Sequence, residues 1–423
     1  MTTLNHLKNS SQELDSTLED TGVNIKTSFL KGLRITVVSG GGIAAIEVPR
    51  FVRELRRHGA ETRVCITANC LKFIGLESLR WASQNEVIQN PTGLSDHICT
   101  SDIVVVVPAT ADLISKISHG ICSDGATTFV QSALGGNKTV LFCQTMHDSL
   151  SNSPVIQKNM DDLKKIPHVH FISPRKEEGK QKIPDVQTLA LEVCHMANKI
   201  KNQRKENILI TYGGTRVMLD PVRCITNIST GNLGMEVTNL FYGMGYSLTV
   251  LAANTTQSLP QLEDIKFNFL PNYQDMFDFC SHIKPDDYQG LIHLVAGSDF
   301  IPQKVENSKI QSQLDKLTLI LTKAKKLITQ TKLNKISYKA AAKLTAGETK
   351  AAGLKKAHEF LNENHLDAVF WNTAADAWSG NNNHSGVFIE KAKNKINEIT
   401  VDHKNEIALC YLNSFQKNQN LRG

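Results

Sequence analysis

The sequence has no C-x-x-C pair among its nine cysteines, and several of them lie inside apolar runs. This spacing excludes a zinc ribbon and indicates no disulfide framework, so we expect reduced, buried thiols in a cytoplasmic protein. No apolar run approaches membrane-spanning length, and the polar N-terminus lacks the apolar core of a secretion signal. We therefore expect a flexible extension over residues 1–30 and no membrane partner.

The sequence also has no arginine-rich tail and no helix-turn-helix or zinc-finger pattern. Its formal net charge is only +6 and its pI is near 8.7. Such a mild excess of positive charge suits small anionic substrates. Because the sequence has no nucleic-acid-binding motif, we expect no nucleic-acid partner. At 423 residues with 41% hydrophobic content, the chain is long enough for two or three globular domains.

Two glycine-rich turns lie within residues 207–234. An apolar run at 208–210 predicts a buried parallel strand, which breaks at Gly213-Gly214-Thr215-Arg216. We expect residues 220–223 to be extended and a helix to begin at Met235. Glycines and small hydroxyls at strand-to-helix junctions let backbone N–H groups approach an anion. The stretch therefore predicts a phosphate site.

Strands alternate with helices in both halves of the chain, which predicts an α/β fold with two doubly wound, Rossmann-like domains. A helix at 186–199 and a charged linker at 199–207 separate a domain at 31–200 from one at 201–415. The expected strands are 33–38, 61–67, 103–107, 139–143, 208–211, 248–252 and 291–296, with helices at 48–58 and 73–82.

The run GGTRVMLDPVRCITNISTGNLG resembles the nucleotide-binding signature of phosphopantothenate–cysteine ligase. Residues 296–300 and 309–312 resemble two further segments of that family. The resemblance implies that cysteine is ligated to 4'-phosphopantothenate at the expense of CTP with Mg²⁺, through metal ligands that the sequence leaves unknown. It implies a catalytic cation at Lys309 and an acyl-intermediate contact at Asn227. The implied nucleotide and substrate contacts are Gly213, Thr215, Arg216, Asp220, Arg223, Ser229, Gly231, Asp299, Lys323 and Lys343.

The first half resembles the flavin-dependent phosphopantothenoylcysteine decarboxylases, which have a flavodoxin-like fold. The resemblance lies in the turns at 39–45 and 108–111 and in the segment 119–124. It implies FMN as cofactor and His97 as a catalytic residue. The implied FMN contacts are Ser39, Gly41, Gly42, Ile43, Thr67, Pro108, Ala109 and Thr110. The two resemblances together imply both of these steps of coenzyme A synthesis, carried out by a homo-oligomer.

Several positions depart from the two family patterns. Asp112 and His147 stand where the decarboxylases carry asparagine, and residues 176–180 lack the expected cysteine. Asn232 replaces a lysine and Ala342 an aromatic residue of the ligases, which leaves CTP or ATP open as the nucleotide. Three hypotheses follow: a bifunctional decarboxylase–ligase, a ligase with an inactive flavin-domain scaffold, and a non-catalytic flavin-binding regulatory subunit.

Overall fold

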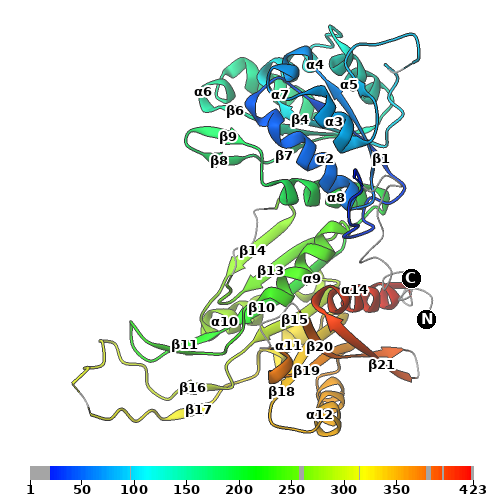
Figure 1. Cartoon of the computed structure of the whole chain (residues 1–423). Helices are drawn as coiled ribbons and strands as arrows, with labels where there is room; N and C mark the ends of the chain where they lie inside the picture. The colour runs from blue at the N-terminus through cyan, green and yellow to red at the C-terminus, as the bar shows by residue number, and fades with distance from the viewer. Residues whose placement is uncertain are drawn as a thin grey trace. The chain divides into compact units, whose positions relative to one another are not determined.

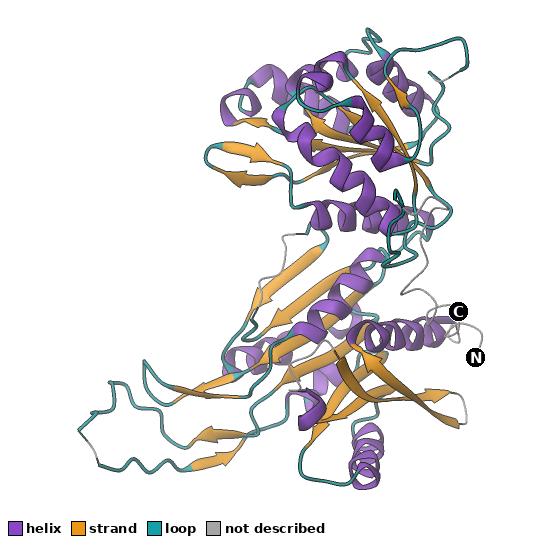
Figure 2. Cartoon of the chain, in the orientation of Figure 1, coloured by secondary structure: helices purple, strands orange, loops and turns teal. Residues whose placement is uncertain are grey.

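The computed structural model describes residues 20–95, 97–256, 262–313, 315–377, 383–392 and 395–420. The chain divides into two compact units, Met1–Gln203 and Arg204–Gly423, each built from a sheet and helices (Figures 1 and 2). Within the described ranges, no helix is both long and apolar enough to cross a membrane. Most of residues 1–30, where we expected an extension, lies outside these ranges.

The N-terminal unit contains a six-stranded parallel sheet in the order β3-β2-β1-β4-β5-β7. All seven residues of its central strand β4 are buried, which accounts for the unbroken apolar run seen in the sequence. The strands are β1 (Arg34–Ser39), β2 (Glu61–Ile66), β3 (Val87–Ile88), β4 (Ile103–Ala109), β5 (Thr139–Gln144) and β7 (Val169–Ile172).

Helices cover both faces of this sheet, and each face has its own apolar cluster. One face carries η1 (Ile43–Glu47), α2 (Val48–Arg57), η2 (Ala68–Lys72), α3 (Leu76–Ser83) and α8 (Val186–Lys201); the other carries α4 (Ala111–Ser118), α5 (Gly125–Gly135) and α7 (Pro154–Lys164). The doubly wound prediction is confirmed. The helix expected at 73–82 begins only at Leu76, because Gly75 before it has an extended backbone.

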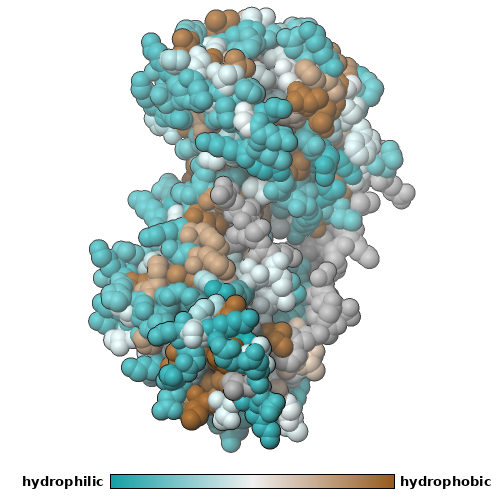
Figure 3. Space-filling view, turned by 90° about the vertical axis from the view of Figure 1, so that its left-hand side faces the viewer, coloured by the Kyte–Doolittle hydropathy of each residue, from teal (hydrophilic) through white to brown (hydrophobic). Residues whose placement is uncertain are grey.

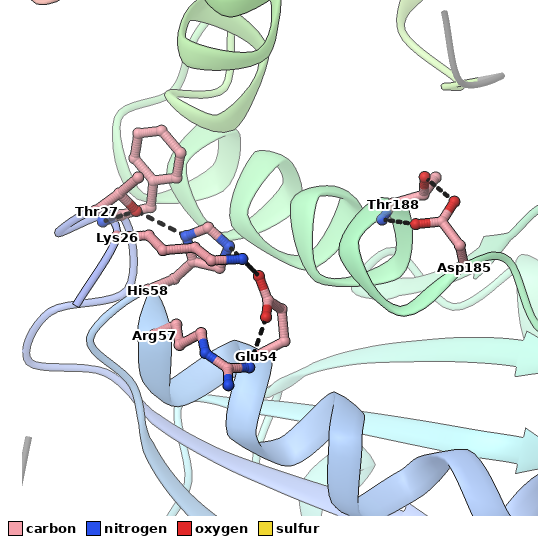
Figure 4. A network of polar contacts seen from close by, with 8 residues as sticks. Lys26, Thr27, Glu54, Arg57, His58, Asp185 and Thr188 are labelled. Atoms are coloured by element: carbon pink, nitrogen blue, oxygen red, sulfur yellow. Dashed lines mark hydrogen bonds and ion pairs between the residues drawn. The ribbon is translucent and has the colours of Figure 1, made fainter. Parts of the chain in front are cut away.

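A partly buried polar network attaches Lys26 and Thr27, close to the first described residues, to α2 (Figure 4). The Glu54 carboxylate accepts hydrogen bonds from Lys26 Nζ (2.5 Å) and Arg57 Nη1 (2.9 Å). His58 contacts the Thr27 hydroxyl through Nδ1 at 2.7 Å. The side chain of Glu54 is only 5% exposed, so its charge depends on these partners.

A small antiparallel sheet lies beside the end of β5, formed by β6 (Met146–His147), β8 (Arg175–Glu177) and β9 (Lys180–Lys182). The short helix α6 (Asp148–Ser151) follows β6.

The C-terminal unit contains an eight-stranded sheet in the order β14-β13-β10-β15-β18-β19-β20-β21. The first six strands in this order are parallel and β20 and β21 are antiparallel to their neighbours. The strands are β10 (Asn207–Gly214), β13 (Ser247–Ala252), β14 (Ile265–Phe269), β15 (Gly290–Ala296), β18 (Tyr338–Thr345), β19 (Ala368–Thr373), β20 (Asn383–Ala392) and β21 (Lys395–His403).

Helices α9 (Asn232–Gly243) and α14 (Lys404–Asn420) pack together, and Phe415 of α14 contacts the rings of Phe241 and Tyr338. The remaining helices are α10 (Tyr273–His282), η3 (Pro285–Asp287), η4 (Leu327–Thr329), α11 (Thr331–Asn334), α12 (Lys350–Glu363) and α13 (Ala374–Ala377). Helix α9 begins at Asn232 rather than at Met235, because Gly231 serves as its N-cap.

Two narrow hairpins project from this unit (Figure 1). One pairs β11 (Arg216–Met218) with β12 (Cys224–Thr226), and the other pairs β16 (Phe300–Pro302) with β17 (Leu321–Lys323). The expected extended segment 220–223 is instead the turn of the first hairpin. On the face shown in Figure 3, hydrophobic residues form separate patches in a largely hydrophilic surface.

Candidate functional sites

The strand order of the N-terminal sheet reverses between β1 and β4, and ligands of such sheets bind outside the strand ends at this point. The predicted flavin turns lie there. The Gly40 N–H donates to the Pro108 carbonyl at 3.2 Å, and the Thr67 N–H donates to the Ser39 carbonyl at 3.1 Å. The fold therefore brings together the turns that begin at Ser39, Thr67 and Pro108.

These turns are packed too closely for side chains at two glycines. A Cβ on Gly41 would lie 2.3 Å from Asn69 Cβ, and one on Gly40 would lie 2.7 Å from the Pro108 oxygen. The hydroxyls of Thr67 and Thr145 are buried and have no hydrogen-bond partner in the described part of the chain. Unpaired buried hydroxyls beside glycine-rich turns suit the oxygen atoms of a phosphate or a flavin ring. The residues present fit a flavin.

Three other polar residues of the N-terminal unit that were discussed from the sequence, His97, Asp112 and His147, are exposed. His97 lies on the loop between β3 and β4, is exposed, and makes no hydrogen bond or ion pair with another described residue. Asp112 is exposed and pairs with Lys116 at 2.9 Å. His147 is also exposed and caps α6, where its Nδ1 accepts from the Ser149 N–H.

In the C-terminal unit the strand order reverses between β10 and β15, and a cavity of about 680 Å³ opens at this point. Its walls come from the turn before α9, the end of β15, and the ends of β18 and β19. Of the residues predicted from the sequence, those that line it are Asn227, Ser229, Gly231, Asp299 and Lys343.

Helix α9 begins directly against β10 because glycines remove the side chains between them. A Cβ on Gly234 would lie 2.2 Å from Tyr212 Cβ, and one on Gly214 would lie 2.4 Å from the Asn227 oxygen. Gly231 has φ +75°, a backbone conformation that side chains disfavour. Residues 231–234 at this helix start line the cavity, and a helix N-terminus is an arrangement that favours an anion.

Side-chain bonds join the ends of β10 and β15. The Asn227 Nδ2 donates to the carbonyls of Gly297 (2.9 Å) and Ala296 (3.2 Å). The Ser298 N–H donates to Thr215 Oγ1 at 2.9 Å. Asn227 and Thr215 thus fix the two turns across the switch point, and no described residue donates to the amide oxygen of Asn227.

Asp220 has a different environment from the cavity residues. Its side chain is fully buried and accepts from the Val222, Arg223 and Ile310 N–H groups and from Arg223 Nη1. Burial would raise the pKa of Asp220, but these hydrogen bonds outweigh it and lower the pKa to about 2. Arg223 also donates to the Ile310 carbonyl at 3.1 Å. This group of bonds, the Asp220 clasp, fixes the backbone beside Lys309.

Several predicted contacts do not line the cavity. Arg216 donates through Nε to Asn272 Oδ1 at 2.9 Å. Lys309 is exposed on the loop between β16 and β17, and Lys323 is exposed in β17. The predicted residues outside the lining are Gly213, Thr215, Arg216, Asp220, Arg223, Lys309 and Lys323.

Several residues that line the cavity were not predicted from the sequence: Tyr212, His293, Lys326, Asn372, His384 and Lys404. Asn372 follows an apolar strand, and parallel sheets bind ligands at their strand ends, so its position in the sequence could have identified it as a site residue. The lining contains three lysines (Lys326, Lys343 and Lys404) and a single carboxylate, Asp299. Burial lowers the pKa of His293 to about 4, so this ring is neutral. The cavity is therefore cationic.

The fold and the sites define a protein with two Rossmann-like units, one with a flavin-type turn cluster and one with a cationic cavity beside a glycine-rich turn. Residues 24–198 match the Flavoprotein family, and residues 203–417 match the DNA/pantothenate metabolism flavoprotein C-terminal domain. The N-terminal unit is thus a flavoprotein domain.

The chain is also similar to curated proteins over most of its length. It is 30% identical over 345 residues to the coenzyme A biosynthesis bifunctional protein CoaBC of Thermococcus kodakarensis, covering 78% of this chain and 84% of that one. It is 30% identical over 362 residues to the CoaBC of Methanocaldococcus jannaschii, covering 84% and 87%. A solved DNA/pantothenate metabolism flavoprotein from Streptococcus pneumoniae is 27% identical, with a TM-score of 0.44, over 50% of this chain and 99% of that one. The chain belongs to the family of bifunctional coenzyme A biosynthesis proteins.

Proposed function

We propose that the cavity of the C-terminal unit binds CTP and 4'-phosphopantothenate and joins the latter to cysteine. The observation that carries this proposal is the cationic cavity at the β10–β15 switch point, with the glycine-rich turn 227–234 on one side. A lining with three lysines and one carboxylate has a net positive charge, which attracts a nucleoside triphosphate and a phosphorylated acid. The helix start at α9 adds N–H groups for the phosphates.

The ligation takes two steps. A carboxylate oxygen of phosphopantothenate attacks the α-phosphorus of CTP, the bond to the β-phosphate oxygen breaks, and pyrophosphate leaves. The amine of cysteine then attacks the acyl carbon, CMP leaves, and the amine proton passes to solvent. Asn227 contacts the acyl group through its amide oxygen, while its Nδ2 is held by the Gly297 carbonyl. Lys309 supplies a cation to the developing charge, and Mg²⁺ shields the triphosphate.

The N-terminal unit binds FMN and decarboxylates phosphopantothenoylcysteine. FMN supplies the redox chemistry that allows CO₂ to leave the cysteinyl group. Ser39, Gly41, Gly42, Ile43 and Thr67 hold the cofactor from the β1 and β2 ends, and Pro108, Ala109 and Thr110 hold it from the β4 end. The buried, unpaired Thr67 hydroxyl supports this assignment. His97 acts on the substrate from the neighbouring loop.

A second candidate is a ligase whose flavin domain only scaffolds the protein. The observation that favours it is the turn of the β8–β9 hairpin, which has Glu178 and Gly179 in place of a cysteine-bearing segment. The pairing of Asp112 with Lys116 also points away from a substrate role for that side chain.

The ligase is tested by pyrophosphate release from CTP in the presence of phosphopantothenate, cysteine and Mg²⁺. We expect release by the wild type and a large loss in Lys309→Ala, whereas Lys316→Ala, an exposed lysine of the same loop, retains activity. If the Lys309 and Lys316 variants behave alike, the catalytic role of Lys309 is wrong.

The decarboxylase is tested by CO₂ release from phosphopantothenoylcysteine with FMN. We expect the wild type to release CO₂, His97→Asn to lose the activity, and His168→Asn, just before β7 and at the opposite edge of the sheet from the flavin turns, to keep it. Absence of CO₂ from a flavin-loaded wild type that retains ligase activity selects the scaffold.

We further propose a cytoplasmic homo-oligomer that contacts small-molecule substrates. The support for an oligomer is apolar exposure on the projecting β16–β17 hairpin and the loop between its strands, where Phe300 is 56% and Ile320 65% exposed. Light scattering of the purified protein distinguishes an oligomer from a monomer.

A further inference from the structure

One of the three lysines that line the cavity comes from the C-terminal helix. Lys404 is the first residue of α14, and α14 packs against α9 (Figure 1). The residues at the start of α9, from Gly231 to Gly234, line the same cavity. The starts of two neighbouring helices therefore lie beside one cavity, and a lysine occupies the second of them.

The charge of Lys404 acts on the first turns of α9. Residues 229–236 contain no lysine or arginine of their own and carry one acid, Glu236. Partial burial raises the pKa of Glu236, and Lys404 opposes this. Burial lowers the pKa of His384 in β20, Lys404 lowers it further, and Asp376 opposes them. The Lys404 ammonium group is therefore close to both α9 and β20, and it supplies the positive charge that the glycine-rich turn lacks.

Lys404 is not neutralised by the protein around it. Among the described residues, none forms a hydrogen bond or an ion pair with its side chain, which is half-buried. The first residue of a helix is also an unfavourable place for a positive charge, because the helix dipole is positive at that end. An anion bound in the cavity would stabilise a lysine in this position.

Tyr212 provides an observation that does not depend on charge. Its ring packs against the start of α9, where a Cβ on Gly231 would lie 3.2 Å from Tyr212 Cδ2. Tyr212 lines the cavity and is 1% exposed, and its buried hydroxyl has no hydrogen-bond partner in the described part of the chain. Buried hydroxyls are normally paired, and a bound oxyanion is a partner that would satisfy this one.

We propose that Lys404 is the cation that binds a phosphate group of a substrate at the start of α9. The inference rests on the proposed ligase function and adds to it a binding residue from α14. The backbone N–H groups at the start of α9 and the ammonium group of Lys404 share the same anion. Both the triphosphate of CTP and the phosphate of 4'-phosphopantothenate have this chemistry, and the test distinguishes them.

The test is calorimetric binding of CTP with Mg²⁺, and separately of 4'-phosphopantothenate, to the full chain. We expect Lys404→Met to bind one of the two ligands about tenfold more weakly, with a smaller difference from the wild type at high salt. Lys404→Arg keeps the charge and most of the affinity. Asn232→Lys in the Lys404→Met background returns a cation to the first residue of α9, which lines the cavity, and restores most of the binding.

The control is Lys266→Met, an exposed lysine of β14 outside the cavity lining, which keeps wild-type binding. Folding of each variant is checked by circular dichroism and thermal unfolding. A loss confined to CTP assigns the triphosphate to α9, and a loss confined to 4'-phosphopantothenate assigns that phosphate. A folded Lys404→Met variant that binds both ligands like the wild type, or loses both equally, overturns the role of Lys404 alone. A wild type that binds neither ligand overturns the proposed function and this inference with it.

Discussion

His58 predicts a defined acid sensitivity of the N-terminal unit. Burial lowers the pKa of His58 to about 4, the neighbouring Glu54 opposes this, and Lys26 and Arg57 reinforce it (Figure 4). In the unfolded chain the same imidazole has an ordinary pKa of about 6.5. Because the folded pKa is the lower one, the unfolded state binds the extra proton between these values, and stability falls as the pH falls.

The size of the effect follows from this difference. At about 1.4 kcal/mol for each tenfold change in proton affinity, the full loss is about 3 kcal/mol, and about 2.5 kcal/mol of it is reached between pH 7 and pH 4.5. Glu54 has a lowered pKa as well, so its contribution is lost at still lower pH. A variant is needed to isolate the histidine.

The assay is hydrogen exchange of the α2 amides in urea at pH 7 and pH 4.5, with intrinsic rates corrected for pH. Since His58→Gln cannot titrate, we expect the pH-dependent loss of protection to be smaller by about 2.5 kcal/mol in this variant. His119→Gln, at an exposed position, serves as the control. Equal pH dependence in the wild type and His58→Gln would refute the reasoning, whatever the variant does to stability at pH 7.

Three other substitutions have clear expected outcomes. Gly41→Ala places a Cβ 2.3 Å from Asn69 Cβ, so we expect loss of bound flavin absorbance, whereas Gly75→Ala, where a Cβ meets nothing within 4 Å, keeps it. Gly234→Ala places a Cβ 2.2 Å from Tyr212, so we expect a destabilisation of about 1–3 kcal/mol in thermal unfolding and weaker CTP binding; an unchanged melting temperature contradicts the close packing. Asp220→Asn weakens the Asp220 clasp beside Lys309, so we expect kcat of the ligase to fall about tenfold or more with little change in KM for CTP, and a change confined to KM counts against this role.

The sequence predicts the parts of the sites that depend on backbone geometry. Turns such as 39–42 and 229–234 need glycines because neighbouring atoms lie too close for a Cβ, and these glycines can be read directly from the sequence. The central strands are equally predictable, because burial on both faces requires a continuous apolar run such as β4.

Side-chain environments depend on distant segments and are harder to predict. Asp220 looks like a ligand contact in the sequence, yet its carboxylate is occupied by Arg223 and by the N–H of Ile310, which lies 90 residues away. His384 and Lys404 carry no local motif. The pairing of β20 with β19 brings His384 to the cavity, and the pairing of β21 with β20 brings Lys404 there at the start of α14. Asp220 and Arg223 as ligand contacts remain predictions.

The antiparallel attachment of β20 allows part of the cavity lining to change independently of the glycine-rich turn. The turn at Gly231 and Gly234 is part of the parallel core, so changing it disturbs the packing of α9 on β10. His384 instead belongs to an appended hairpin, β20 and β21, that pairs with β19 from Ala368↔Glu390 to Trp371↔Val387. A slip of one residue in that pairing would turn His384 to the opposite face of the sheet and leave the glycine-rich turn intact. Substitutions in the hairpin can therefore alter this side of the cavity while the core that carries the turn stays folded.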